Sequence, residues 1–344
     1  MVAGLPLYSL LTNLSDTPAG FDAFVHPGVN TKLYNILLKW QTLLESSEST
    51  VVLSSEKGGW LSHEALREIV EYTGGDPDHD KFEDFYQCDP KNPHYGFTSY
   101  DDFFARDLLP EKRAVENPKA PQIISAACTS FIHTLYPDLC ETDSFWVKGT
   151  PYSLKHLLGN HCLTTSFVGG TLLQGLLTSL DFHRWCSPVN GVVKGTSLIP
   201  GTYFAARLDQ LEENAPFLQP SQKVEIIYED PLVRSQDFST AVAARALIFI
   251  EAEDPVGLMC FVAVGMGDVS TCRLSVKEGQ SVKKGDPLGS FHYGGSTHCL
   301  ILGPHLKVGL GRDTKTGELL KQRTNDSPGS KVHVGRQLLV VEKN

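Results

Sequence analysis

A glycine-punctuated segment near the C-terminus ends in the tetrad Gly294-Gly295-Ser296-Thr297, which constrains this chain more than any other feature. A Gly-Ser bond on a tight turn can react with itself, because glycine has no Cβ and permits close approach and unusual dihedral angles. The Ser hydroxyl adds to the Gly carbonyl, an ester forms and eliminates, and the serine becomes a pyruvoyl group. Such a carbonyl condenses with an amine and withdraws electrons, as pyridoxal phosphate does. Taken alone, the tetrad is more typical of a surface turn.

Composition indicates a soluble globular protein. The 344 residues carry 41% hydrophobic and 20% charged side chains, enough for one large or two ordinary domains. The net charge of −10, with scattered Lys and Arg, argues against nucleic acid and against tight docking on anionic lipid. No run of 18 apolar residues occurs, and the apolar start lacks the basic region of a signal peptide. We therefore expect a soluble, cytoplasmic protein without integral membrane contact.

The eight cysteines form no CxxC pair. In a chain of this size without a secretion signal, cysteines are more often reduced and packed than disulfide-bonded. We expect all eight to be free thiols.

The first 110 residues have helical patterns. Apolar residues recur at helical spacing over 30–45, Ser62 precedes a helix that is expected to end near Tyr72 before two glycines, and Ser99 caps a short third helix. These patterns predict a helical N-terminal cap over 1–110. A polar, proline-containing linker follows over 111–121.

Strands dominate the predicted catalytic domain, residues 122–344. Short apolar or alternating runs separated by Gly and Pro predict strands at 122–124, 189–193, 223–228, 245–251 and 258–264. A short helix is expected over 153–158. Periodicity does not decide between helix and strand for 170–179. The fold class that this order favours is α+β.

The segment 276–291 resembles the glycine-punctuated hairpins of lipoyl- and biotinyl-type domains. Those hairpins carry a modifiable lysine at the tip in a Met-Lys-like sequence, and no such tip occurs here. We therefore expect a barrel-sandwich-like β core in which Lys277, Lys283 and Lys284 are ordinary solvated charges.

Five stretches, in the same order, resemble the phosphatidylserine decarboxylase family, and most closely its soluble fungal branch, which decarboxylates free aromatic amino acids such as tryptophan. They lie at 88–106, 145–154, 167–185, 244–272 and 294–297. The third ends in Asp181-Phe182-His183-Arg184-Trp185. Each stretch is weak evidence alone, but jointly they are specific. The resemblance covers roughly residues 20–305.

The resemblance implies roles for particular residues. Ser296 becomes the precursor of a pyruvoyl cofactor, with autocatalytic cleavage after Gly295 converting a zymogen into two chains. His183 matches the family's decarboxylation histidine, the expected general acid that protonates the substrate Cα. Without the resemblance, His183 is more simply a structural histidine.

Two departures from the family pattern concern activation of the serine. The family has an aspartate in a Ser-Pro-Ala-Asp-Gly-like segment, but residues 125–129 read Ser-Ala-Ala-Cys-Thr and hold no carboxylate. Cys186 stands where the family has a second histidine. Serine activation normally needs a base oriented by a third group. Asp181, His298 and Cys186 are the remaining candidates, and self-cleavage is expected to be slow or absent if none serves.

The remaining site predictions concern substrate and metal. Thr297 and His298 follow the serine and are expected close to its carbonyl, while Phe182, Trp185 and Tyr293 suit an aromatic substrate but equally suit a core. His292, His298, Cys299 and His305 lack zinc spacing, so no metal site is predicted. Residues 265–268 lack the third glycine of a nucleotide loop and are interpreted as a turn. Pyridoxal phosphate is not expected.

Two functions remain open. The first is a pyruvoyl-dependent decarboxylase of a free L-amino acid, aromatic and tryptophan-like, in secondary metabolism. The second is an unprocessed homologue without the cofactor that catalyses a cyclisation or rearrangement, or binds a ligand. The sequence identifies neither the exact substrate, the pathway nor the oligomeric state.

Overall fold

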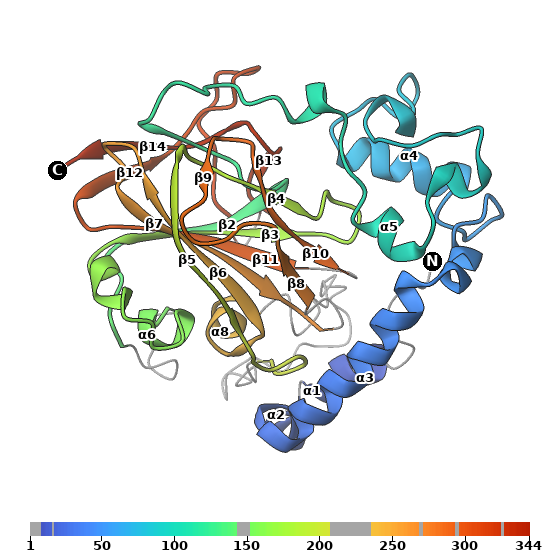
Figure 1. The fold of residues 1–344 in the computed structure, drawn as a ribbon, viewed down its shortest axis with the longest axis horizontal. Coiled ribbons are helices and arrows are strands. Elements are labelled where there is room, and N and C mark those ends of the chain that lie inside the picture. Colours follow the sequence, from blue (N-terminus) through green and yellow to red (C-terminus); the bar gives the residue numbers. More distant parts are fainter. Residues whose placement is uncertain are drawn as a thin grey trace, which may run out of the picture.

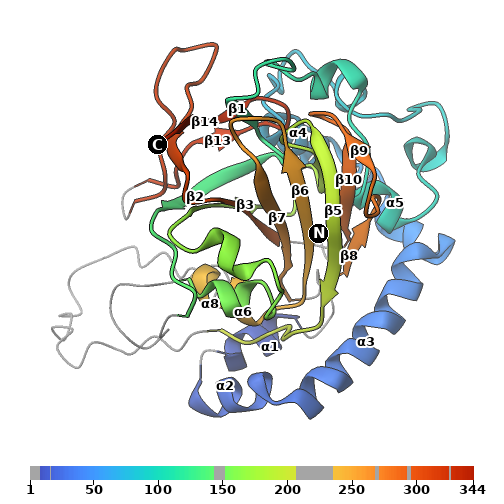
Figure 2. The same cartoon turned by 60° about the vertical axis from the view of Figure 1, so that its left-hand side comes forward.

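The structure is a computed structural model that describes residues 8–15, 17–142, 152–206, 235–267, 271–292, 296–324 and 327–344. Helices form the N-terminal part and antiparallel strands the remainder, so the fold is α+β (Figure 1). The long helix α3 runs along one side of the molecule in both views (Figures 1 and 2). No helix of the described residues is long and apolar enough to cross a membrane.

The three helices predicted from the N-terminal sequence are confirmed. Ser62 accepts a hydrogen bond from the Ala65 amide at the start of α4, and Ser99 accepts one from the Asp102 amide at the start of α5. The helical elements before the sheet are α1 (Tyr8–Ser15), α2 (Pro18–Val25), α3 (Pro27–Glu45), η1 (Ser47–Val52), α4 (His63–Tyr72), η2 (Phe82–Asp84), η3 (Pro93–Gly96), α5 (Tyr100–Phe104) and η4 (Pro110–Arg113).

The largest sheet has eight strands in the order β13-β2-β3-β11-β7-β6-β5-β9, with every neighbouring pair antiparallel. Its strands are β2 (Ser130–Tyr136), β3 (Thr171–Leu177), β5 (Gly191–Ile199), β6 (Arg245–Ala252), β7 (Leu258–Gly265), β9 (Ser281–Val282), β11 (Ser296–Leu302) and β13 (Lys331–Val332). The ambiguous segment 170–179 is thus a strand. The shorter helices α6 (Leu154–Leu157), η5 (Thr164–Phe167) and α8 (Gln236–Val242) lie between strands in sequence.

Two three-stranded sheets complete the described strands. One has the order β1-β14-β12 and the other β4-β10-β8. Their strands are β1 (Ile123–Ser125), β4 (Arg184–Cys186), β8 (Thr271–Leu274), β10 (Pro287–His292), β12 (Leu306–Leu310) and β14 (Gln337–Lys343). The described pairings leave the sheets open rather than closed into a barrel, so the barrel-sandwich detail stays a prediction.

Most strand predictions are confirmed, with one shift. The strand expected at 189–193 begins at Gly191 and continues to Ile199. The C-terminal part of β5 is not buried, so its sequence has no apolar run that would predict a strand there. The strand predicted at 223–228 lies outside the described residues.

One hydrophobic core joins the helical and β-rich parts. Trp60 and Phe103 from the N-terminal part share a buried cluster with Phe182 and Trp185. The division at residue 110 therefore stays a prediction about sequence regions, because the two parts are not separated by solvent. All eight cysteines are free, as predicted.

The prediction that Lys284 is a solvated charge is wrong. Lys284 is buried, and its ammonium donates to the carbonyls of Asn117, Ala120 and Ile123 at 3.0, 2.7 and 2.6 Å. Burial lowers its pKa to about 8. Lys284 thus binds the linker to the β9–β10 turn, a long-range contact that local sequence does not reveal.

Candidate active site around Ser296

Ser296 is the first residue of β11 and is fully buried between two neighbouring strands. It pairs with Leu177 of β3 and with Gly265 of β7. Its hydroxyl has no hydrogen-bond partner among the described residues. Buried polar groups in proteins are nearly always satisfied, so the unpaired hydroxyl makes Ser296 a candidate for a reactive serine. Gly294 and Gly295 lie outside the described residues.

The two residues after Ser296 point to opposite faces of the sheet, because side chains alternate along a strand. His298 lies on the Ser296 face, with Leu300 in the main core, whereas Thr297 lies on the other face with Cys299. Thr297 and His298 were both predicted beside the new carbonyl, but they do not share a surface.

Thr297 belongs to a buried polar network. Its hydroxyl donates to the Gly175 carbonyl at 2.9 Å and accepts from the Gln174 amide at 3.0 Å. The Tyr152 hydroxyl donates to the other end of that amide at 2.5 Å. The network fixes the start of β11 from the face opposite Ser296.

His183 precedes β4 and is fully buried, with its ring stacked on Phe104 of α5 at 4.1 Å between centroids. Neither ring nitrogen makes a well-aligned hydrogen bond to a described residue. Burial lowers its pKa to about 3, and the nearby Arg106 guanidinium adds to that shift. At pH 7 only about 10⁻⁴ of the resting rings are protonated. His183 therefore becomes a proton donor only where a bound anion raises its pKa.

Arg106 holds the segment that precedes His183. Its guanidinium donates to the Leu180 carbonyl at 2.7 Å and lies over the Tyr86 ring at 4.5 Å. It is buried, so its charge is dispersed onto carbonyls and an aromatic face. The segment 180–183 is thereby fixed from the helical part of the chain.

Asp181 is engaged at both carboxylate oxygens. One oxygen accepts from the Thr178 amide at 2.7 Å and from its hydroxyl at 2.8 Å, while the other lies 2.6 Å from the Lys331 ammonium. These charge-assisted contacts hold the side chain in place. Asp181 consequently fixes a turn beside His183 and is a poor candidate for taking the serine proton.

Two buried thiols occupy the region where the family pattern has an aspartate and a histidine. Burial raises the pKa of Cys186 to about 12 and that of Cys128 well above its ordinary value, and the nearby Cys186 adds to the shift at Cys128. The Cys186 amide donates to the Ala127 carbonyl at 2.8 Å, which joins β4 to the segment 125–129. The Thr129 hydroxyl accepts from the Val334 amide at 3.2 Å. Neither thiol is a base near neutral pH.

His298 is also fully buried, with its ring 5.8 Å from that of Phe261. It packs against Gly175, where an added Cβ would lie 2.5 Å from the ring, so only glycine fits at that position. Burial lowers the pKa of His298 to about 4. Its imidazole is neutral at pH 7.

The predicted aromatic substrate contacts lie in the core. Trp185 packs edge-on against Phe291 at 4.9 Å and against Phe261 at 5.5 Å, and Phe182 is equally buried. In this conformation Phe182 and Trp185 present no surface to a substrate. Tyr293 lies outside the described residues.

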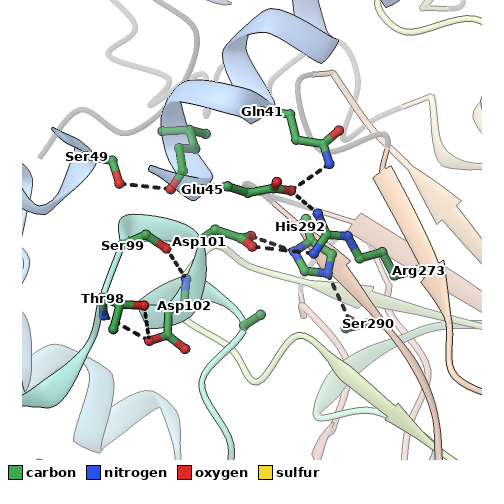
Figure 3. A network of polar contacts seen from close by, with 12 residues as sticks. Gln41, Glu45, Ser49, Thr98, Ser99, Asp101, Asp102, Arg273, Ser290 and His292 are labelled. Atoms are coloured by element: carbon green, nitrogen blue, oxygen red, sulfur yellow. Dashed lines mark hydrogen bonds and ion pairs between the residues drawn. The ribbon is translucent and has the colours of Figure 1, made fainter. Parts of the chain in front are cut away.

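The sequence analysis missed a Ser–His–Asp arrangement that Figure 3 displays. His292 Nδ1 lies 2.5 Å from an Asp101 carboxylate oxygen, and His292 Nε2 lies 3.0 Å from the Ser290 hydroxyl. Arg273 contacts the second Asp101 oxygen at 3.8 Å and also pairs with Glu45 of α3. His292 was considered only as a metal ligand. The sequence did show that His292 lies four residues before Ser296, which could have marked it as a site residue. It did not show the pairing of His292 with Asp101, which is 191 positions away.

A cavity of about 670 Å³ lies between α3, the end of β5 and β8. Its lining includes Tyr34, Leu38, Tyr203 and Thr271, and the two tyrosine rings stack at 6.3 Å. Thr271 pairs with His292 across β8 and β10, so the cavity begins one strand away from the Ser–His–Asp arrangement. Among the described residues no three His, Cys, Asp or Glu side chains form a possible metal site.

Comparison with known proteins decides the family. The family model described as phosphatidylserine decarboxylase matches residues 100–339, which is more than half of the chain. The chain belongs to the phosphatidylserine decarboxylase family. A second model of the same description matches residues 1–69. The curated relatives reported below are carboxy-lyases, and this protein is an enzyme of that class.

The relatives are fungal decarboxylases and, more distantly, bacterial and eukaryotic proenzymes. Decarboxylase iboD of Amanita muscaria is 41% identical over 92% of this chain and 89% of its own. L-tryptophan decarboxylase of Psilocybe cubensis is 36% identical over 87% of this chain and 68% of its own. A phosphatidylserine decarboxylase proenzyme of Chlamydia pneumoniae is 27% identical over 62% of each chain. Autocatalytic processing of a zymogen fits the name proenzyme.

Proposed function

We propose that this enzyme is a pyruvoyl-dependent decarboxylase of a free L-amino acid, with an aromatic, tryptophan-like substrate in secondary metabolism. The observation that carries the proposal is the fully buried Ser296 hydroxyl without a partner among the described residues. Two relatives named L-tryptophan decarboxylase, 36% and 34% identical, support the substrate class.

The residues around position 296 fit a pyruvoyl group. Gly265 is the β7 partner of Ser296 and has no Cβ that would crowd a planar carbonyl. No described residue forms a hydrogen bond with the Ser296 hydroxyl. When present, such a group would withdraw the electron pair that remains on the substrate Cα after carbon dioxide leaves. Neutral His183, held by Phe104, takes up a proton as the substrate carboxylate approaches and delivers it to the substrate Cα, the step expected of its family counterpart.

The cavity beside α3 suits the side chain of an aromatic substrate. Its volume of about 670 Å³ falls in the range typical of small-molecule sites, and Tyr34 and Tyr203 offer ring faces for stacking. Recognition of a free amino acid by this small-molecule cavity agrees with the net charge of −10, which disfavours nucleic acid and anionic lipid. A cytoplasmic location, a helical region over 1–110 and a barrel-sandwich-like core complete the proposal.

The test treats purified protein with an aldehyde- and ketone-reactive hydrazide and separately incubates it with a panel of L-amino acids. We expect label only on the smaller chain, beginning at residue 296, and amine formation from aromatic substrates. Label on no chain, together with no amine from any amino acid, contradicts the proposal.

A second function is favoured by one observation, the pair of buried thiols near the position of the family's base. With the Cys186 pKa near 12, the family's usual serine activation is absent, and an unprocessed chain keeps the fold and the cavity. In that case we propose a non-decarboxylative cyclisation, a rearrangement or ligand binding. A full-length chain that binds aromatic amino acids without releasing carbon dioxide supports this alternative.

A further inference from the structure

The Ser290–His292–Asp101 arrangement is buried and is held by two short polar contacts. A carboxylate only accepts hydrogen bonds, so the Asp101 oxygen at 2.5 Å assigns the ring proton to His292 Nδ1. Nε2 lies 3.0 Å from the Ser290 hydroxyl. All three residues are at most 8% exposed. The outcome is an imidazole that a carboxylate orients, with its Nε2 turned toward a serine hydroxyl, as in hydrolytic triads.

The short helix α5 positions both histidines of this region. Asp101 contacts His292, and Phe104, three residues later on the same helical face, stacks on His183. Ser99 caps the helix through the Asp102 amide, and Arg273 braces Asp101 against α3 through Glu45. This bracing holds the carboxylate that orients His292.

His292 is also close in sequence to the bond that must break. It ends β10, four residues before Ser296, so the two Cα atoms are at most about 15 Å apart along the chain. The Phe291 amide donates to the His183 carbonyl at 2.9 Å, and His292 lies near enough to disfavour protonation of His183. His183 is thus bonded to the strand that ends at His292, and Ser296 begins β11 four residues after that end.

We propose that His292, oriented by Asp101, is the base that activates Ser296 for self-cleavage in this protein, in place of the family histidine that Cys186 replaces. The inference rests on the proposed function, since it supplies a step that a pyruvoyl-dependent enzyme needs. The other described candidates are weaker. Cys186 is a protonated thiol and both Asp181 oxygens are engaged. Among the described residues, no carboxylate is hydrogen-bonded to the ring of His183 or His298.

The reaction balances with water as the only co-reactant. His292 Nε2 takes the Ser296 hydroxyl proton as Oγ bonds to the Gly295 carbonyl carbon. The Gly295–Ser296 C–N bond then breaks, and the proton passes to the released amine, which leaves an ester.

In the second stage the regenerated imidazole removes the Ser296 Cα proton. The Cβ–Oγ bond breaks, and Gly295 leaves as a carboxylate. Water hydrolyses the remaining enamine after tautomerisation, and ammonium departs with the proton that the imidazole had taken.

The test follows cleavage by denaturing mass spectrometry in the full-length chain, which is independent of decarboxylase activity. Asp101→Asn preserves shape but no longer holds the proton on Nδ1, so cleavage should slow by about 10²–10⁴-fold. The matched control is Asp102→Asn, an exposed neighbour on α5 that accepts from Thr98 and should cleave like the wild type. His292→Gly should remain uncut, and added imidazole should restore cleavage.

The outcomes separate chemistry from folding. Thermal unfolding of each variant identifies those that are folded, and Asp101→Asn decides the matter if His292→Gly does not fold. Cleavage of folded Asp101→Asn within threefold of the wild type overturns the inference, as does a folded, uncut His292→Gly chain that imidazole does not rescue. A wild type that never cleaves instead removes the proposed function itself.

Discussion

Lowering the pH from 7 to 5 should destabilise this protein through its two fully buried histidines near Ser296. Burial lowers the pKa of His183 to about 3 and that of His298 to about 4, whereas both titrate near 6.5 in the unfolded chain. The unfolded chain therefore binds these protons first. Stability is fully present above pH 6.5 and is lost as the pH falls toward 4 and 3. At pH 5 each histidine lowers the free energy of unfolding by about 2 kcal/mol, or about 4 kcal/mol together.

Urea unfolding at pH 7 and pH 5 measures this loss. Ser296→Ala provides an uncleaved background, so that a single chain unfolds. In that background, His183→Gln with His298→Gln should lose about 4 kcal/mol less than the parent between the two pH values. His333, whose pKa is also lowered to about 4, is present in both proteins and cancels from the comparison. Equal losses within about 1 kcal/mol would show that the two rings are not buried in neutral form.

Three further outcomes are expected. His183→Ala should lower amine formation by about 10²–10⁴-fold while self-cleavage suffers less, and unchanged turnover removes His183 from the mechanism. Cys186→His should accelerate self-cleavage, because a neutral imidazole accepts protons where a thiol of pKa about 12 does not. The double variant with Thr129→Glu should cleave faster still. Equal cleavage rates in the wild type, the single variant and the double variant would contradict this. Tyr203→Ala should raise the KM for an aromatic amino acid about tenfold, with kcat within about threefold, since it removes a ring that stacks on Tyr34 at the cavity wall. An unchanged KM excludes that cavity as the substrate site.

Local patterns in the sequence predicted the elements that depend on local interactions. Helical spacing over 30–45 and the capping residues Ser62 and Ser99 located three helices, because capping and amphipathic periodicity are decided within a few residues. Apolar runs located β6 and β7, which are buried on both faces. Only the first part of the half-exposed strand β5 was predicted, because its later residues form no apolar run.

Contacts between distant segments were not predictable in the same way. The resemblance identified Ser296 and His183 as candidate site residues. Lys284, by contrast, was predicted to be solvated, although its ammonium donates to three carbonyls more than 160 positions away. Asp101 and His292 are 191 positions apart, and only the packing of α5 on β10 brings them together. The shifts in the pKa of Cys186 and His183 likewise arise from burial, which no motif reports.

The most direct test of the central claim is the intact mass of the purified wild-type protein under denaturing conditions. We predict two chains, residues 1–295 and 296–344, with the smaller lighter by one ammonia than the hydrolysed peptide because it begins with a pyruvoyl group. Ser296→Ala should give one full-length chain. A wild type that remains a single chain of 344 residues after long incubation would contradict the account.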